Sequence, residues 1–168
     1  MSSKVSERVL SIPLSGIRKV VEYAKGLPDV IFLNIGEPDF TTPEHIREAA
    51  KKSIDKSFTH YTSIWGLLEL REAVAEKLRR ENGIDVDAGS EILITAGAQP
   101  AFFSVCKTLL DPGDEVIVQD PFYSSYEVTL RVVGAKIIRV PMKERMGFSI
   151  DPNDVEAKIT NKTKMMVL

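Results

Sequence analysis

A turn of small residues that opens a predicted helix is the first place in the sequence where chemistry could occur. The turn runs Thr95-Ala96-Gly97-Ala98-Gln99-Pro100 and follows a short β-branched run. The first N–H groups of a helix have no intrahelical acceptor and lie at the positive end of its dipole, which favours binding of an anion. Pro100 has no N–H, so the donors to a phosphate would be the backbone amides of Gly97, Ala98 and Gln99. The alternative is a tight strand-to-helix turn without a ligand.

An aromatic side chain follows the next predicted strand. Tyr123 ends the segment Asp120-Pro121-Phe122-Tyr123, which lies at the carboxyl end of that strand. Open α/β sheets bind their ligands outside the carboxyl ends of the strands, so the Tyr123 ring could stack on a flat heterocycle. The alternative is an aromatic residue that only closes the loop, at the surface or in the core.

Two loops supply the remaining candidates. Gly36 lies in the segment NIGEPDF, where a glycine permits close approach of a ligand to the backbone, or only a turn with positive φ. Tyr61 lies on the irregular connection that ends at Trp65 and Gly66. Its hydroxyl could donate a hydrogen bond to an anion, although a partly buried tyrosine with a solvated hydroxyl is the simpler interpretation.

Several other chemistries lack their motifs. The sequence contains neither G-x-G-x-x-G nor G-x-x-x-x-G-K-[ST], the glycine-rich signatures of nucleotide binding. His45 and His60 lie far apart, without cysteines or carboxylates at the spacing of metal ligands. No serine lies in a G-x-S-x-G nucleophile elbow. Asp85 and Asp87 are typical of solvated loop charge.

Strands and helices that alternate along the chain must position these residues. The spacing of apolar residues and capping residues predicts helices over 16–25, 43–54, 67–82, 100–110, 124–133 and 152–159, and strands over 92–95, 115–119, 136–140 and 164–168. Such alternation indicates right-handed βαβ units and an α/β fold with a mainly parallel sheet. Gly134 is the expected end of the fifth of these helices.

Composition restricts the class of protein. A chain of 168 residues is long enough for one domain with a core, and its net charge of −2 gives no general case for binding nucleic acid or an acidic membrane. No apolar stretch approaches the roughly 20 residues of a membrane span. The N-terminus lacks the long apolar core of a secretory signal, so we expect a cytoplasmic protein. Cys106, the only cysteine, is expected to be a buried structural thiol.

Four segments together resemble one family. In order they are NIGEPDF-TTPEHI, YTSIWGLLELREAVAEKL, ILITAGAQPAFF and LLDPGDEVIVQDPFYSSY, and they cover nearly the whole chain. The chain resembles the N-terminal portion of class I aminotransferases of fold type I, which depend on pyridoxal 5′-phosphate, especially their aspartate and aromatic branch. The resemblance implies an N-terminal arm, helix and small-domain segment over 1–40, and the first part of the large cofactor-binding domain over 41–168.

The resemblance also implies roles for individual residues. Gly97, Ala98 and Gln99 match the turn that holds the phosphate of the cofactor, and Tyr123 matches the aromatic residue that stacks on its pyridine ring. Tyr61 matches the tyrosine that reaches the phosphate of the neighbouring subunit's site, which implies a homodimer. Gln99 and Pro100 depart from the commoner residues at these two positions.

Three further residues are expected to face the substrate, an amino acid or a 2-oxo acid. Gly36 matches the glycine whose backbone contacts the substrate carboxylate. Ile17 and Trp65 lie in the segments that are expected to influence substrate selectivity, with Trp65 favouring apolar or aromatic substrates.

Much of the family's catalytic apparatus has no match in these 168 residues. The Schiff-base lysine, the aspartate that pairs with the pyridine nitrogen, and the arginines for phosphate and substrate carboxylate all belong to later segments of relatives. No catalytic residue is therefore assigned, and we expect the chain alone to be inactive, as a fragment or a truncated product. The alternatives are a non-catalytic interaction module, or a lyase or synthase of the same fold.

Overall fold

The computed structural model describes residues 4–10, 12, 16–34 and 36–168 of the chain. Contacts between Cα atoms divide the chain into two compact units, one of Met1–Val30 with Gly97–Leu168 and one of Ile31–Ala96. These units are a division by packing, and the domain boundary expected at residue 40 stays a prediction.

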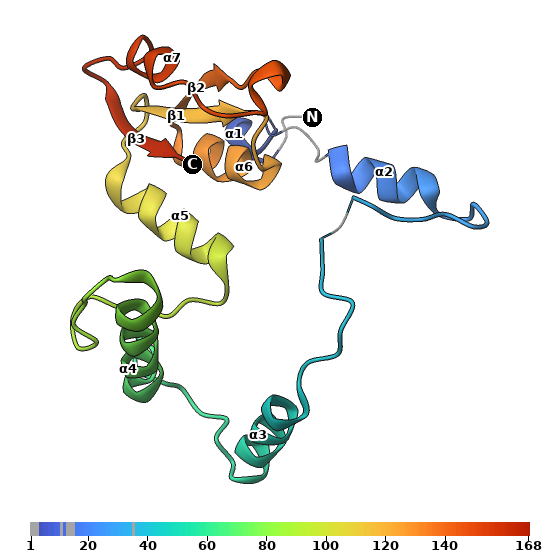
Figure 1. Cartoon of the computed structure of the whole chain (residues 1–168), viewed down its shortest axis with the longest axis vertical. Helices are drawn as coiled ribbons and strands as arrows, with labels where there is room; N and C mark the ends of the chain where they lie inside the picture. Colours follow the sequence, from blue (N-terminus) through green and yellow to red (C-terminus); the bar gives the residue numbers. More distant parts are fainter. Residues whose placement is uncertain (1–3, 11, 13–15, 35) are drawn as a thin grey trace. The chain divides into compact units, whose positions relative to one another are not determined.

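A parallel sheet organises the first unit. Its strands are β1 (Glu115–Asp120), β2 (Lys136–Pro141) and β3 (Thr163–Val167), in the spatial order β2-β1-β3 (Figure 1). Both pairings of β1 are parallel, and the ladder with β2 runs from Glu115 opposite Lys136 to Asp120 opposite Pro141. The expected α/β fold with a mainly parallel sheet is confirmed.

Helices connect and flank these strands. α6 (Ser124–Val133) links β1 to β2, and the short helices η2 (Glu144–Met146) and α7 (Pro152–Glu156) lie between β2 and β3. α5 (Ala98–Leu109) precedes β1 and packs against α6. The helices α1 (Glu7–Leu10) and α2 (Gly16–Ala24) belong to the same unit, and α1 contacts α6.

The central position of β1 explains its sequence. Parallel strands that are covered on both faces are nearly continuous apolar runs, and Val116, Ile117 and Val118 are at most 1% exposed. The core cluster combines β1 with α5 and α6 through Cys106, Leu110, Val116, Val118, Leu130 and Val133. Each such aliphatic side chain contributes roughly 1.5–3 kcal/mol by burial. Cys106 is fully buried, as expected, and burial raises the pKa of its thiol.

The second unit is helical. It contains α3 (Glu44–Asp55), α4 (Leu68–Lys77) and a π-helical turn, η1 (Leu78–Asn82), that ends at the left-handed Gly83. Arg71 on α4 is buried and donates hydrogen bonds to the carbonyl oxygens of Ala88 and Gly89. One buried guanidinium thus ties α4 to the loop that follows η1.

Most predicted elements are confirmed to within two residues, with two exceptions. Residues 92–95 form no strand; the Ile94 N–H donates to the Trp65 carbonyl at 3.0 Å, a loop contact and not part of a strand ladder. A β-branched run becomes a strand only where a partner strand lies beside it. α7 ends at Glu156, three residues before the expected end, although Asp151 caps it as expected by accepting from the Asn153 N–H. Gly134 ends α6 with φ of 86°, as expected.

None of the helices in the described ranges has the length and apolar character needed to cross a membrane. The cytoplasmic location stays a prediction.

A carboxylate at the amino end of β1 gives the first testable prediction. Glu115 is buried, accepts from the Thr160 hydroxyl at 2.6 Å and pairs with the Lys136 ammonium at 2.9 Å. The hydrogen bond from Thr160, followed by that from Lys136, lowers the pKa of Glu115 below the ordinary 4.5. A depressed carboxyl pKa stabilises the fold above the unfolded-state pKa, and this contribution is lost as pH falls through the folded-state value.

The Glu115→Gln variant should therefore unfold at lower denaturant concentration than the parent at pH 7, and the difference should shrink as the pH falls below 4.5. Urea titrations followed by circular dichroism from pH 7 to pH 3 measure this difference. The control is Glu156→Gln, because Glu156 is exposed and makes no ion pair with the described residues. A difference between Glu115→Gln and the parent that did not shrink with falling pH would contradict the prediction.

Candidate functional site

The segment after β1 delivers Tyr123 to the carboxyl edge of the sheet. β1 ends at Asp120, the Asp120–Pro121 peptide bond is cis, and Tyr123 is the N-cap residue of α6. The neighbouring Phe122 is partly buried against the core, whereas Tyr123 is 53% exposed. The Tyr123 ring is thus an accessible aromatic surface at the edge where parallel α/β sheets bind ligands.

Two aromatic contacts support the Tyr123 ring. The Tyr126 ring lies edge-on to it, with a centroid separation of 5.3 Å and an interplanar angle of 86°. Tyr126 in turn lies against Phe102 of α5 at 4.6 Å. Edge-to-face pairs at such separations are attractive beyond the burial of area, so this row of rings connects α6 to α5 beside the candidate site.

Opposite charges surround the same segment. Arg139 of β2 pairs with Glu127 at 2.8 Å and with Asp120 at 3.6 Å, and Arg131 pairs with Glu127 at 2.7 Å. The Arg139 guanidinium also lies over the Phe122 ring, 4.9 Å from its centroid. Burial alone would raise the pKa of Glu127, but the hydrogen bonds from Arg131 and Arg139 hold it below its ordinary value.

The N-terminus of α5 provides the predicted anion donors. Gly97 precedes the helix with φ of 94°, a left-handed conformation that glycine adopts without strain, and a Cβ at this position would meet no atom within 4 Å. The helix begins at Ala98, and no side chain caps it. Ala98 and Gln99 are its first two residues, so neither amide has an intrahelical acceptor, and Pro100 supplies no donor.

The other predicted residues belong to the second unit, Ile31–Ala96. Tyr61 is 107% exposed and lines a depression together with Thr59 and His60, and Trp65 is 49% exposed. Gly36 lies in irregular backbone, and a Cβ added there would meet no atom within 4 Å. The proximity of Tyr61, Trp65 or Gly36 to Tyr123 stays a prediction. Ile17 lies in α2, and its side chain is outside the described part of the structure.

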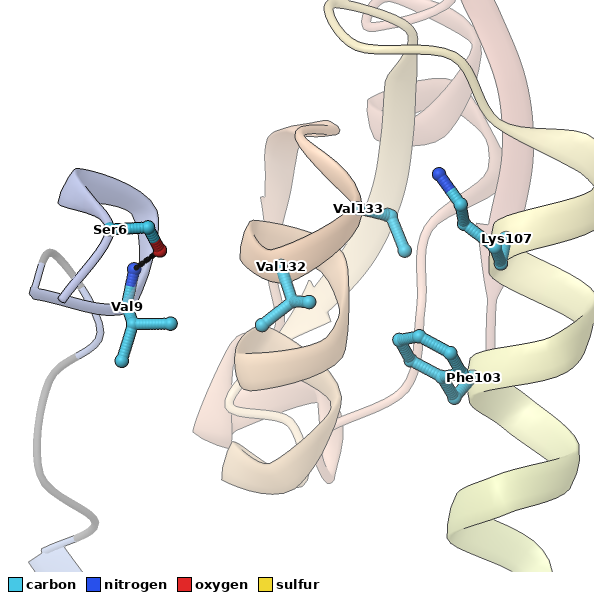
Figure 2. Close-up of a pocket in the computed structure, with 6 residues that line it drawn as sticks. All are labelled: Ser6, Val9, Phe103, Lys107, Val132 and Val133. Carbon is cyan, nitrogen blue, oxygen red and sulfur yellow. Dashed lines mark hydrogen bonds between the residues drawn. The ribbon is translucent and has the colours of Figure 1, made fainter.

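A cavity of about 330 Å³ lies elsewhere in the first unit. Figure 2 shows its lining: Ser6 and Val9 at the start of the chain, Phe103 and Lys107 of α5, and Val132 and Val133 of α6. None of these is a predicted site residue. Among the described residues there is no group of three or more His, Cys, Asp or Glu side chains that could hold a metal ion.

Sequence reasoning missed the charged residues beside Tyr123. Arg139 and Glu127 are 12 positions apart and meet only because β2 pairs in parallel with β1, and α6 packs along that pair. The sequence signal was weak: an arginine within a mostly apolar strand, and an acid in the first turn of the preceding helix.

Comparison with known proteins gives one consistent result. The family described as aminotransferase class I and II matches residues 28–168. The chain is 45% identical to an aspartate aminotransferase of Pyrococcus horikoshii over 164 residues, which are 98% of this chain and 42% of the relative. It is 40% identical to aromatic-amino-acid aminotransferase 2 of Thermococcus litoralis, with the same coverage.

Solved structures agree with the sequence matches. The aspartate aminotransferase of Thermus thermophilus with maleate is 40% identical, with a TM-score of 0.92 over 99% of this chain and 44% of that chain. An alanine aminotransferase from Pyrococcus furiosus is 36% identical, with a TM-score of 0.89 over 97% of this chain and 43% of that one. The chain thus spans about two fifths of the length of the relatives it matches.

Gly66, in the loop that carries Tyr61 and Trp65, gives a second testable prediction. Its φ is +91°, and a Cβ added there would lie 2.5 Å from the Ile94 Cβ and 2.6 Å from its Cγ1. Gly66→Ala should therefore combine backbone strain of roughly 1–3 kcal/mol with a steric clash, and displace the contact between Trp65 and Ile94. Urea unfolding monitored by the fluorescence of Trp65, the only tryptophan, measures the loss.

Gly83→Ala is the matched control, because Gly83 has φ of +66° with nothing within 4 Å of its added Cβ. It should show the strain without the clash. Equal destabilisation by the two substitutions would mean that the Ile94 contact does not restrict residue 66.

Proposed function

The chain belongs to the family of class I and II aminotransferases, and we propose that it serves the transfer of an amino group between an L-amino acid and a 2-oxo acid with pyridoxal 5′-phosphate as cofactor. The observation that carries the proposal is the family match over residues 28–168, together with 45% identity to an aspartate aminotransferase. The relatives named for aspartate and for aromatic amino acids make these two classes the first substrates to test.

The chemistry of the first unit fits the phosphate of this cofactor. The α5 N-terminus offers the Ala98 and Gln99 amides, and Gly97 leaves open space where a side chain would otherwise stand. Free amides at the positive end of a helix dipole suit a phosphate dianion. The half-exposed Tyr123 ring at the carboxyl edge of β1 suits a planar heterocycle. These features support the proposal that Gly97, Ala98, Gln99 and Tyr123 bind the cofactor.

In this mechanism the residues of the chain bind and orient. When bound, the cofactor would supply an electron sink. The α5 amides would hold its phosphate, while the Tyr123 ring would lie against its heterocycle and exclude water from it. Fixing both ends restricts the cofactor to one orientation, which lowers the entropic cost of reaction.

Residues outside the cofactor segments supply the proposed substrate and subunit contacts. We propose that the Gly36 backbone contacts the substrate carboxylate, and that Trp65 and Ile17 influence which side chain is accepted. The high exposure of Tyr61 is consistent with a hydroxyl that reaches the phosphate of a second subunit, and this role makes the working form a homodimer.

Removal of a single amide tests the phosphate site. Proline is favoured at the first position of a helix, so Ala98→Pro should keep α5 while deleting one N–H donor. A hydrogen bond to a charged group contributes about 1.5–3 kcal/mol, so the affinity for pyridoxal phosphate should fall roughly tenfold or more. Equilibrium dialysis against pyridoxal phosphate and inorganic phosphate measures the change.

Leu68→Pro is the matched control, because it places proline at the first position of α4, a helix with no proposed ligand. Its affinity for pyridoxal phosphate should equal that of the parent. If Ala98→Pro bound both ligands as tightly as the parent, the proposed phosphate site at α5 would be wrong.

A fourth prediction concerns turnover. No residue of the 168 matches the lysine that bonds to the cofactor in the family, so the chain alone should bind pyridoxal phosphate without transaminating aspartate or phenylalanine. Chromatography measures the amount of the corresponding 2-oxo acids that is formed. Turnover above that of free cofactor would contradict this prediction.

A further inference from the structure

A cluster of three side chains around Arg139 flanks Tyr123 on both sides along the chain. Before Tyr123, the Arg139 guanidinium pairs with Asp120 and lies over the Phe122 ring. After Tyr123, the same guanidinium pairs with Glu127, in the first turn of α6, at 2.8 Å. A single side chain of β2 therefore contacts both segments that define the backbone position of Tyr123.

The backbone of the same segment is held as well. The Met142 N–H donates to the Asp120 carbonyl at 2.8 Å, and the Tyr126 N–H donates to the Tyr123 carbonyl at 3.0 Å. These bonds fix the two ends of the segment but leave Phe122 and the Tyr123 side chain to side-chain contacts. Phe122 packs against the core, and the guanidinium of Arg139, whose side chain is 40% exposed, lies over the Phe122 ring.

We propose that Arg139 is a positioning residue, which holds the segment from Asp120 to Glu127 so that the Tyr123 ring presents its face to the cofactor. This inference rests on the proposed function, because Arg139 would orient the Tyr123 ring that is proposed to bind the cofactor. Arg139 acts through Phe122 and Glu127 and touches neither cofactor nor substrate.

The planar shape of the guanidinium is the physical basis of this role. It can stack on the Phe122 ring with its flat face while its N–H groups donate sideways to Glu127. A lysine ammonium in the same place could pair with Glu127 but could not stack and donate in this way. Arg139→Lys should therefore restore part of what Arg139→Gln removes.

Fluorine NMR reports the ring directly and needs no cofactor. The chain has four tyrosines, so uniform incorporation of 3-fluorotyrosine gives four resonances, from Tyr23, Tyr61, Tyr123 and Tyr126. In Arg139→Gln the Tyr123 resonance should shift or broaden, while the exposed Tyr23 and Tyr61 stay unchanged as internal references. Arg145→Gln is the matched control, because Arg145 forms no ion pair or hydrogen bond with the described residues.

Cofactor binding is the second measurement, made by equilibrium dialysis on the same variants. The dissociation constant for pyridoxal phosphate should rise roughly threefold to tenfold in Arg139→Gln and less in Arg139→Lys. The dissociation constant for inorganic phosphate should stay at the parent value, because the α5 amides do not depend on Arg139. Circular dichroism in the far ultraviolet verifies that the variants are folded.

The outcomes separate this inference from the proposed function. A Tyr123 resonance that is the same in Arg139→Gln and Arg145→Gln overturns the inference, whatever the cofactor does. A shifted resonance with an unchanged dissociation constant for pyridoxal phosphate overturns it too, because the ring position would then not matter for binding. A parent chain that binds no pyridoxal phosphate overturns the proposed function and, with it, the assignment of Tyr123 to the cofactor.

Discussion

The parallel pairing of β1 with its two neighbours is the constraint on which the first unit depends. β1 is central in the sheet, and its apolar residues are covered on both faces. The helices α5 and α6 bury Cys106, Leu130 and Val133 against it. Because α5 enters this core and α6 leaves from the end of β1, the helix N-terminus at Gly97 and the ring of Tyr123 are parts of one packed unit.

Much of this unit could be predicted from the sequence, because local signals and burial agree there. The run Val116-Ile117-Val118, the turn at Pro112-Gly113 and the stop at Gly134 each specify a strand or a boundary by their residue types. Residues 92–95 have the same β-branched texture, yet they form no strand among the described residues. A strand exists only with a partner, and the local sequence carries no information about the partner.

The candidate site also has one part that the sequence predicts and another part that it does not. The donors at Ala98 and Gln99 and the ring of Tyr123 follow from position in a strand-to-helix turn, which the sequence reveals. The charges around that ring do not, because Arg139 of β2 meets Glu127 only where α6 packs against β2. The residues proposed to bind the cofactor thus follow from sequence motifs, whereas the residues that support them depend on how the strands and helices pack.

The ion pair between Glu115 and Lys136 has a consequence for the register of β1 and β2. The two residues are direct partners at the first rung of the β1–β2 ladder, and Arg139 pairs with Asp120 near its last rung. Because Val116, Ile117 and Val118 are apolar and buried, a slip of the β1–β2 register would change the apolar character of β1 very little. Any slip would nevertheless move Glu115 away from Lys136, so this ion pair favours one register where hydrophobic patterning alone is indifferent.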